Sequence, residues 1–225
     1  MNFKKIWRFI WHDDSLLSWI INVILAFVLV KFILYPGLGL ILQTTHPVVA
    51  VVSGSMEHKM VHPCISYRGG ICIERDLTRY EICGNSFSKK EKIDYDIFWK
   101  YCGGWYEDKG IEKEDFSNYI FKNGFNTGDI IFLMGKKSED IKIGDLIVFR
   151  SSQNNNPIIH RVIKKTYQNG VYYITNKGDH NPDSRSDETD IKQDDIIGKA
   201  FLRLPYLGWI KIGFTDLINV FRGGN

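Results

Sequence analysis

Two serines near the start of the chain could take part in acyl transfer. The stretch VVSGSMEH, residues 51–58, places Ser53, Gly54 and Ser55 directly after the apolar segment 46–52. A flanking glycine and a turn would let the hydroxyl of Ser55 project from the end of a strand as a nucleophile. In an extended chain Ser53 lies on the same side, so its hydroxyl could join the backbone N–H of Ser55 in an oxyanion hole. A polar turn that closes the strand is the simpler alternative.

A nucleophilic serine needs a base, which must come from another part of the chain. His160 lies in the sequence Ile-Ile-His-Arg-Val, which has the composition of a strand, although a lone strand histidine is more often structural. A carboxylate that orients the imidazole could come from Asp179, Asp183 or Asp187. These aspartates lie in the loop 176–188, where solvated acidic residues are the alternative interpretation.

The composition is that of a globular protein. The chain has 225 residues, of which 44% are hydrophobic and 24% charged, and its net charge of +3 implies no polyanionic partner such as nucleic acid. The spacing of Cys64, Cys72, Cys83 and Cys102 is unlike paired Cys-x-x-Cys knuckles. We therefore expect no metal site and no cofactor.

One segment near the N-terminus predicts a membrane anchor. Residues 16–35 are apolar apart from Lys31, and 20 helical residues span about 30 Å, the thickness of the hydrocarbon core. Pro36 and Gly37 are expected to end this helix. A cleaved signal peptide would have a shorter core, and a buried helix would have a polar face. The segment is preceded by three basic residues, Lys4, Lys5 and Arg8, which favour a cytosolic N-terminus and an extracytoplasmic remainder. We expect a single span.

After the anchor the chain is rich in short strand-like segments bounded by turn residues, a pattern typical of antiparallel β structure. Asn169-Gly170 predicts a tight hairpin. A further apolar stretch, 207–221, is expected to be a strand or a short amphipathic helix and not a second span. The expected strands lie within residues 128–134, 144–150, 157–165, 170–176 and 196–209.

Residues 58–126 interrupt the strand series and contain all four cysteines. Ile97, Tyr101, Trp105 and Ile120 occur there at helical spacing among charged residues. The expected fold is therefore mainly β, an antiparallel catalytic domain with an N-terminal transmembrane helix and a partly helical insert. The corresponding divisions are a cytosolic N-terminus 1–15, the helix 16–35, a catalytic β domain 36–57 and 127–225, and the insert 58–126.

Five short motifs in order resemble those of type I signal peptidases. They are Ser-Gly-Ser-Met-Glu, Gly-Asp-Leu-Ile-Val-Phe, Ile-Ile-His-Arg-Val, Lys-Gly-Asp-His-Asn and Ile-Gly-Lys-Ala followed by Pro-Tyr-Leu-Gly-Trp. The resemblance is to the archaeal and endoplasmic-reticulum branch, in which a histidine replaces the lysine base of the bacterial enzymes. It covers residues 16–57 and 127–210 and includes the anchor. It implies a signal-peptidase-like β fold.

The resemblance also implies roles for single residues. Ser55 matches the nucleophile, His160 the general base, Ser53 the oxyanion position and Asp179 the first aspartate of the Gly-Asp-x-Asn box. The family usually carries a second aspartate five to seven residues later, where this chain departs from the pattern. Asp183 stands at plus four and Asp187 at plus eight, so both stay candidates for the partner of His160, with Asp183 ranked first. His58 occupies a position where the family often has proline.

The function implied by the resemblance is that of a membrane-anchored serine endopeptidase that removes signal peptides from exported preproteins through a Ser–His acyl-enzyme. An extended substrate would add to the sheet as a strand. The expected partners are preproteins, the lipid bilayer of the cell membrane and the protein translocation channel. The alternatives are an inactive membrane-anchored substrate-binding subunit of the same fold and a self-cleaving, repressor-like protease.

Because the insert is expected outside the cytosol, its four cysteines are predicted to form two disulfides. Three pairings are open, as are four free thiols or an atypical zinc site. We further expect the insert to be dispensable for the chemistry and relevant to substrate docking.

Overall fold

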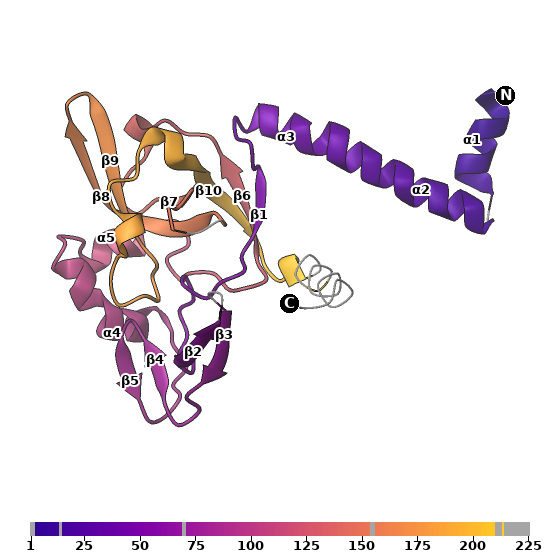
Figure 1. Ribbon diagram of the computed structural model, residues 1–225. Helices are drawn as coiled ribbons and strands as arrows, with labels where there is room; N and C mark the ends of the chain where they lie inside the picture. The colour runs from indigo at the N-terminus through magenta and orange to yellow at the C-terminus, as the bar shows by residue number, and fades with distance from the viewer. Residues whose placement is uncertain (1–2, 14, 69–70, 154–155, 210–212, 214–225) are drawn as a thin grey trace.

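The computed structural model describes residues 3–13, 15–68, 71–153, 156–209 and 213. It consists of a β domain from which one long N-terminal helix projects (Figure 1). Most of the apolar stretch 207–221 lies outside the described residues, so its structure stays a prediction.

The largest element is a six-stranded antiparallel sheet with the order β1-β6-β10-β7-β8-β9. This sheet confirms the predicted fold class and contains every strand expected from the sequence. Asn169 and Gly170 join β8 to β9 with φ values of 50° and 82°, as the predicted tight hairpin requires. The strands are β1 Val48–Ala50, β6 Ile130–Met134, β7 Leu146–Phe149, β8 Ile158–Gln168, β9 Val171–Lys177 and β10 Ile196–Leu204.

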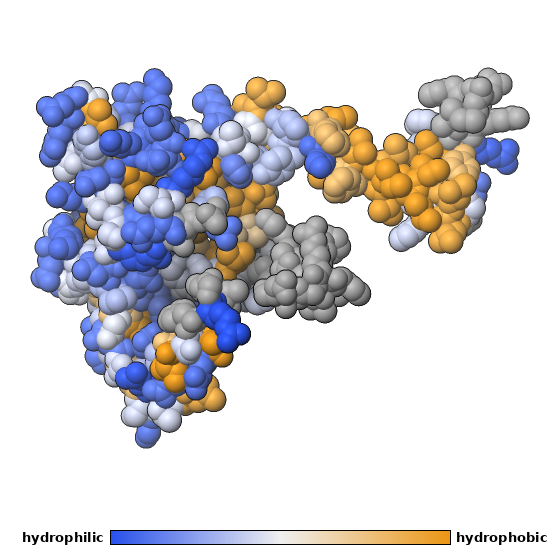
Figure 2. All heavy atoms as spheres, viewed as in Figure 1, coloured by the Kyte–Doolittle hydropathy of each residue, from blue (hydrophilic) through white to orange (hydrophobic). Residues whose placement is uncertain are grey.

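The N-terminal helix runs continuously from Leu16 to Ile41 and is long and apolar enough to cross a bilayer. The face of this helix seen in Figure 2 is mostly hydrophobic. The prediction that Pro36 and Gly37 end it is wrong, because Pro36 lies in the first turn of α3. A π-helical turn comes directly before α3, and irregular turns of this kind accommodate a proline within a continuous helix. The segments are α1 Phe3–His12, α2 Leu16–Leu29, a π-helical turn Val30–Leu34 and α3 Tyr35–Ile41.

The candidate nucleophile follows the edge strand β1, but not within an extended chain. Beyond Ala50 the chain bends, and the N–H of Glu57 donates to the carbonyl of Gly54 at 3.0 Å to close a turn. Both carboxylate oxygens of Glu57 have partners, the N–H of Thr127 and the Lys59 ammonium, each at 2.9 Å. Glu57 therefore fixes the turn that carries Ser55.

The segment expected as an insert contains two short ribbons and two helices. Both predicted disulfides are present and their pairing is Cys64–Cys72 and Cys83–Cys102. The first links the two strands of one ribbon, and the second ties the turn between β4 and β5 to α4. The elements are β2 Cys64–Arg68, β3 Ile71–Arg75, β4 Tyr80–Ile82, β5 Asn85–Phe87, α4 Tyr95–Glu107 and α5 Lys113–Ser117.

Helix α4 turns a different face to the interior than its spacing suggested. Phe98, Cys102 and Tyr106 are buried, one residue further along than the expected row of Ile97, Tyr101 and Trp105. Both rows repeat every four residues and both are apolar, so periodicity alone could not separate them. The buried row belongs to an aromatic cluster that packs against Ile163 of β8, so this segment contacts the sheet directly.

Candidate active site

Strand β8 carries functional side chains on both of its faces, because neighbouring residues in a strand point in opposite directions. His160 and Arg161 follow one another and are both buried, with exposed fractions of 2% and 0%. His160 points toward the turn that holds Ser55, while Arg161 points toward the end of the insert. One strand thus connects the candidate nucleophile with the insert.

Ser55 and His160 meet although 105 residues separate them in sequence. The Oγ of Ser55 lies 2.8 Å from Nε2 of His160. The backbone on each side of Ser55 is also held: its carbonyl accepts the N–H of His180 at 2.9 Å, and the carbonyl of Met56 accepts the N–H of Phe125 at 3.1 Å. A hydroxyl in contact with an imidazole is the arrangement that a serine nucleophile and its base require.

Ser53 lies beside Ser55, with 3.3 Å between the two Oγ atoms. The sequence predicted this proximity from an extended chain, whereas the structure produces it across a bend. Ser53 is exposed. An oxyanion role for Ser53 stays a prediction.

The carboxylate at the imidazole is Glu188, which the sequence did not suggest. Its Oε1 lies 2.8 Å from Nδ1 of His160, and both side chains are buried. This is a close polar contact, which becomes an ion pair when the imidazole is protonated. The other oxygen, Oε2, accepts the N–H of Arg185 at 3.0 Å and fixes the carboxylate in place.

The three aspartates expected as the partner of His160 lie elsewhere. Asp183 accepts from the indole N–H of Trp105 at 3.2 Å, and Asp187 contacts Ser151 and the Arg185 guanidinium. Ser186–Glu188 forms a 3-10 turn, and the side chains of Asp187 and Glu188 leave it in different directions. The stretch 176–188 was singled out from the sequence, but only its aspartates were considered, although a glutamate can make the same contact.

Asp179 forms part of a buried network with Arg161. The Nε and Nη2 atoms of Arg161 donate to the two carboxylate oxygens of Asp179 at 2.9 and 2.7 Å. Nη1 donates to the carbonyls of Ile120 and Gly144, and Nη2 donates also to that of Phe121. All five N–H groups of the guanidinium are therefore satisfied, as a buried arginine requires.

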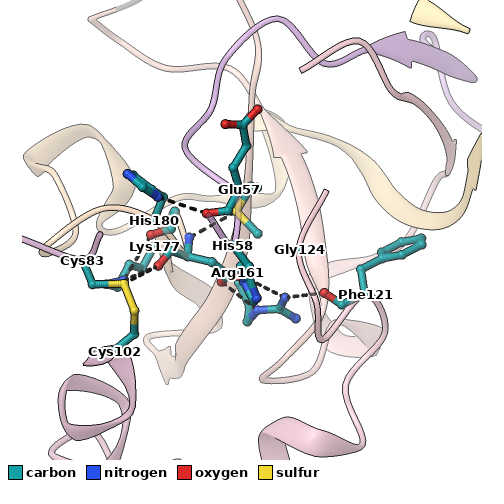
Figure 3. Close-up of polar contacts among 12 residues, drawn as sticks. Glu57, His58, Cys83, Cys102, Phe121, Gly124, Arg161, Lys177 and His180 are labelled. Carbon is teal, nitrogen blue, oxygen red and sulfur yellow. Dashed lines mark hydrogen bonds and ion pairs between the residues drawn. A yellow bond between two sulfur atoms is a disulfide. The ribbon is translucent and has the colours of Figure 1, made fainter. Parts of the chain in front are cut away.

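The insert supplies two more partners to Asp179. Nε2 of His58 lies 3.0 Å from Oδ2, and the hydroxyl of Tyr106 donates to Oδ1 at 2.9 Å. The ring of His58 stacks on Phe98 with 3.6 Å between the centroids. Figure 3 shows His58 and Arg161 side by side in this network, with His180 and Lys177 close by.

Burial and charge set the protonation of these groups. Burial by itself raises the pKa of the Asp179 carboxyl, but the Arg161 charge and the hydrogen bond from His58 hold that pKa well below its usual range. Burial lowers the pKa of His58, and this effect outweighs the attraction of Asp179. Asp179 is thus ionised and His58 is a neutral donor. Burial also lowers the pKa of Lys177 to about 8, against the opposing effect of nearby carboxylates.

Gly178 lies where the catalytic segments come closest together. A Cβ at this position would lie 2.7 Å from Nε2 of His160 and 2.7 Å from the side-chain nitrogen Nδ2 of Asn181. It would lie 2.8 Å from the backbone carbonyl oxygen of Ser55. No side chain fits there, so the glycine is needed for the contact between Ser55 and His160. Among the described residues, no group of three His, Cys, Asp or Glu side chains is arranged to hold a metal ion.

Comparison with curated proteins identifies homologues of the chain, while no protein-family model matches it. The human signal peptidase complex catalytic subunit SEC11C is 34% identical over 98 residues, which cover 41% of this chain and 51% of the relative. The SEC11 subunit of Scheffersomyces stipitis is 30% identical over 98 residues, 58% of its length. That of Colletotrichum graminicola is 29% identical over 98 residues, 57% of its length.

The match spans about half the length of the curated relatives. These relatives are catalytic subunits of the endoplasmic-reticulum type of signal peptidase. They confirm the resemblance that the five short motifs suggest, and they agree with the antiparallel sheet and the apolar N-terminal helix.

Proposed function

We propose that this homologue of the SEC11 subunits is an active, membrane-anchored serine endopeptidase that removes signal peptides from preproteins. The observation that carries the proposal is the 2.8 Å contact between Oγ of Ser55 and Nε2 of His160. An inactive substrate-binding subunit would have no need for a nucleophile in contact with a base, and this favours the enzyme over that alternative.

In the proposed mechanism Ser55 attacks the carbonyl carbon of the scissile peptide bond while its proton passes to Nε2 of His160. The tautomer follows from the contacts: Nδ1 faces Glu188 and carries the proton, so Nε2 is free to accept one. Glu188 orients the ring and stabilises the imidazolium. Because Glu188 and His160 are buried, this charge interaction is little screened by water.

The remaining steps use Ser53 together with Ser55 and His160. The tetrahedral oxyanion is stabilised by the hydroxyl of Ser53, 3.3 Å from the attacking oxygen in the free enzyme. Collapse of the intermediate breaks the C–N bond, and the leaving amine takes the proton from His160. Water, deprotonated by His160, then hydrolyses the ester on Ser55 and restores the hydroxyl.

The substrate would bind as an added strand. β1 is at the edge of the sheet and leads into the turn that holds Ser55, so an extended peptide can pair with its free edge and reach the nucleophile. A signal peptide that emerges from the bilayer beside the anchor is such a segment. We propose that the N-terminus is cytosolic and the catalytic domain extracytoplasmic, and that the partners are preproteins, signal peptidase subunits and the translocation channel.

The test is cleavage of a preprotein by the purified full chain in detergent, with sequencing of the new N-terminus. Ser55→Ala and His160→Ala should each lower the rate by about 10⁴-fold or more, and the double variant should lose little beyond either one. His46→Ala is the matched control, because His46 is exposed and its imidazole bonds only the neighbouring Thr45 among the described residues. A full chain that binds preprotein and does not cleave it would favour the inactive subunit.

A further inference from the structure

The β2–β3 ribbon exposes an unusual amount of apolar surface for its size. Ile65, Ile73 and Leu77 have exposed fractions of 55%, 56% and 72%. In the described part of the chain, β2 and β3 pair only with each other, so the ribbon projects from the sheet it accompanies. Clustered large apolar side chains on a small projecting element mark a contact surface.

The Cys64–Cys72 disulfide holds the two strands of the ribbon together. The register of the ribbon shifts on both sides of Ser66, so Ile65 and Ile73 are left out of the pairing and lie at bulges. Both side chains are more than half exposed. The crosslink therefore stabilises a ribbon whose isoleucines face solvent.

The same ribbon and the turn that follows it also carry exposed basic residues. Arg68 and Arg75 are exposed, and Arg75 also donates to the backbone carbonyl of His62 at 2.8 Å. Arg79 pairs with Asp76 at 2.8 Å, and Glu74 is exposed. Arginine can bind phosphate with two parallel hydrogen bonds while its aliphatic part covers apolar surface. An apolar patch beside arginines fits the phosphate level of a phospholipid bilayer.

The position of the ribbon also indicates that a lipid bilayer lies against it. In Figure 1 the anchor helix leaves the β domain toward the right, and β2–β3 is the part of the insert nearest that side. Figure 2 shows hydrophobic and strongly hydrophilic atoms together over this lower part of the domain. The segment that follows β10, also on this side, exposes Tyr206 and Trp209. A bilayer that contains the helix would therefore face the ribbon.

We propose that the β2–β3 ribbon is a second membrane contact, whose Ile65, Ile73 and Leu77 enter the headgroup region of the bilayer that holds the anchor. The inference rests on the proposed membrane anchoring and is independent of the protease activity. A helix alone leaves the domain free to rotate about the anchor, whereas a second contact would fix the height and tilt of the domain over the bilayer.

The experiment uses the full chain in phosphatidylcholine nanodiscs, with a photoreactive benzophenone amino acid at residue 73 or residue 77. Residue 27, within the anchor, is the positive control. Residue 171 is the negative control, because Val171 is also partly exposed but lies at the tip of the β8–β9 hairpin, on the side away from the helix (Figure 1). After irradiation, mass spectrometry identifies the crosslinked partner.

We expect lipid adducts at residues 73 and 77 at yields at least about tenfold above residue 171. Ile65→Ser should reduce the yield at residue 73. Lipid adducts at residue 27 without an excess at 73 and 77 would overturn the ribbon's role and leave the anchor intact. Absence of lipid adducts at residue 27 would overturn both the membrane anchor and the ribbon contact. Adducts between residue 73 and a second copy or another protein would show that the ribbon is a protein-docking surface instead.

Discussion

At the scale of residues, the candidate chemistry depends on three side chains that come from three separate segments. Ser55 comes from a turn after an edge strand, His160 from strand β8 and Glu188 from a 3-10 turn. Signal-peptidase-like motifs led to the first two directly. The third, Glu188, takes the role for which an aspartate was expected. Glu188 is therefore the most informative residue to test.

Glu188→Gln should lower kcat by about 10³–10⁴-fold, because the imidazole loses its counter-charge and its preferred tautomer. The amide oxygen of glutamine can still accept the N–H of Arg185, so the turn should remain intact. Preprotein cleavage under single-turnover conditions measures the effect. Asp183→Asn is the matched control and should stay within about twofold of the parent rate, since Asp183 contacts Trp105 at the surface. A large loss in Asp183→Asn and a small one in Glu188→Gln would instead assign Asp183 as the carboxylate partner of His160.

Gly178→Ala should abolish most of the activity while the chain still folds. The added methyl would lie 2.7 Å from Nε2 of His160 and 2.8 Å from the carbonyl of Ser55, so the two catalytic groups must separate. We expect a loss of about 10²-fold or more, as for a displacement of about 1 Å at a reacting group. Gly104→Ala on α4 is the control, because a Cβ there meets nothing within 4 Å. Equal activity of both variants would contradict the close approach.

At the scale of elements, β8 joins the candidate active site to the insert. The sequence suggested a dispensable insert, but its residues His58 and Tyr106 bind Asp179, and the carbonyls of Ile120 and Phe121 accept from Arg161. A chain in which Glu57 is joined to Asn126 would leave this buried ion pair with unsatisfied groups. Such a loss is strongly destabilising, so we expect that chain to fold poorly.

Tyr106→Phe should destabilise the protein by about 1–2 kcal/mol, because Asp179 loses one of its buried donors. Denaturant unfolding in detergent, followed by tryptophan fluorescence, measures the change. Tyr167→Phe is the matched control, since Tyr167 lies exposed on the β8–β9 hairpin and should change stability by less than about 0.5 kcal/mol. Similar stability of the two variants would mean that the insert contributes little to the buried network.

The elements show which features a sequence pattern can and cannot predict. The strands and the Asn169-Gly170 turn were predictable because their residues have strong local preferences. The end of the anchor helix was not, because Pro36 follows a π-helical turn within a continuous helix and does not end it. Glu188 was not predictable either, since its contact with His160 depends on how a loop folds over the sheet. Local preference says little about such long-range contacts.

At the scale of the whole molecule, two buried histidines make stability dependent on pH. Burial lowers the pKa of His58 and of His180 below the ordinary value of about 6.5. Below that pH the unfolded chain binds protons that the folded chain does not, so stability falls as the pH is lowered. The slope is up to about 1.4 kcal/mol per pH unit for each histidine.

We therefore expect the melting temperature in detergent to fall between about pH 7 and about pH 5, and His58→Gln to weaken that dependence. Glutamine retains a donor for Asp179 and does not titrate. His46→Gln is the control, because His46 is exposed. A melting temperature that is constant over this range, or equal slopes for the parent and His58→Gln, would contradict the assignment of a neutral, buried His58.

The whole molecule combines an apolar helix, an edge strand beside a serine–histidine pair, and an insert that is bonded into the same network. The most direct test of the central claim is detection of the acyl-enzyme. A signal-peptide-derived ester is mixed with the full chain, the reaction is quenched in acid, and mass spectrometry maps the added acyl mass after digestion. We predict the adduct on Ser55 in the parent, its absence in Ser55→Ala and its much slower formation in His160→Ala. An adduct on another residue, or turnover by Ser55→Ala at the parent rate, would contradict the account.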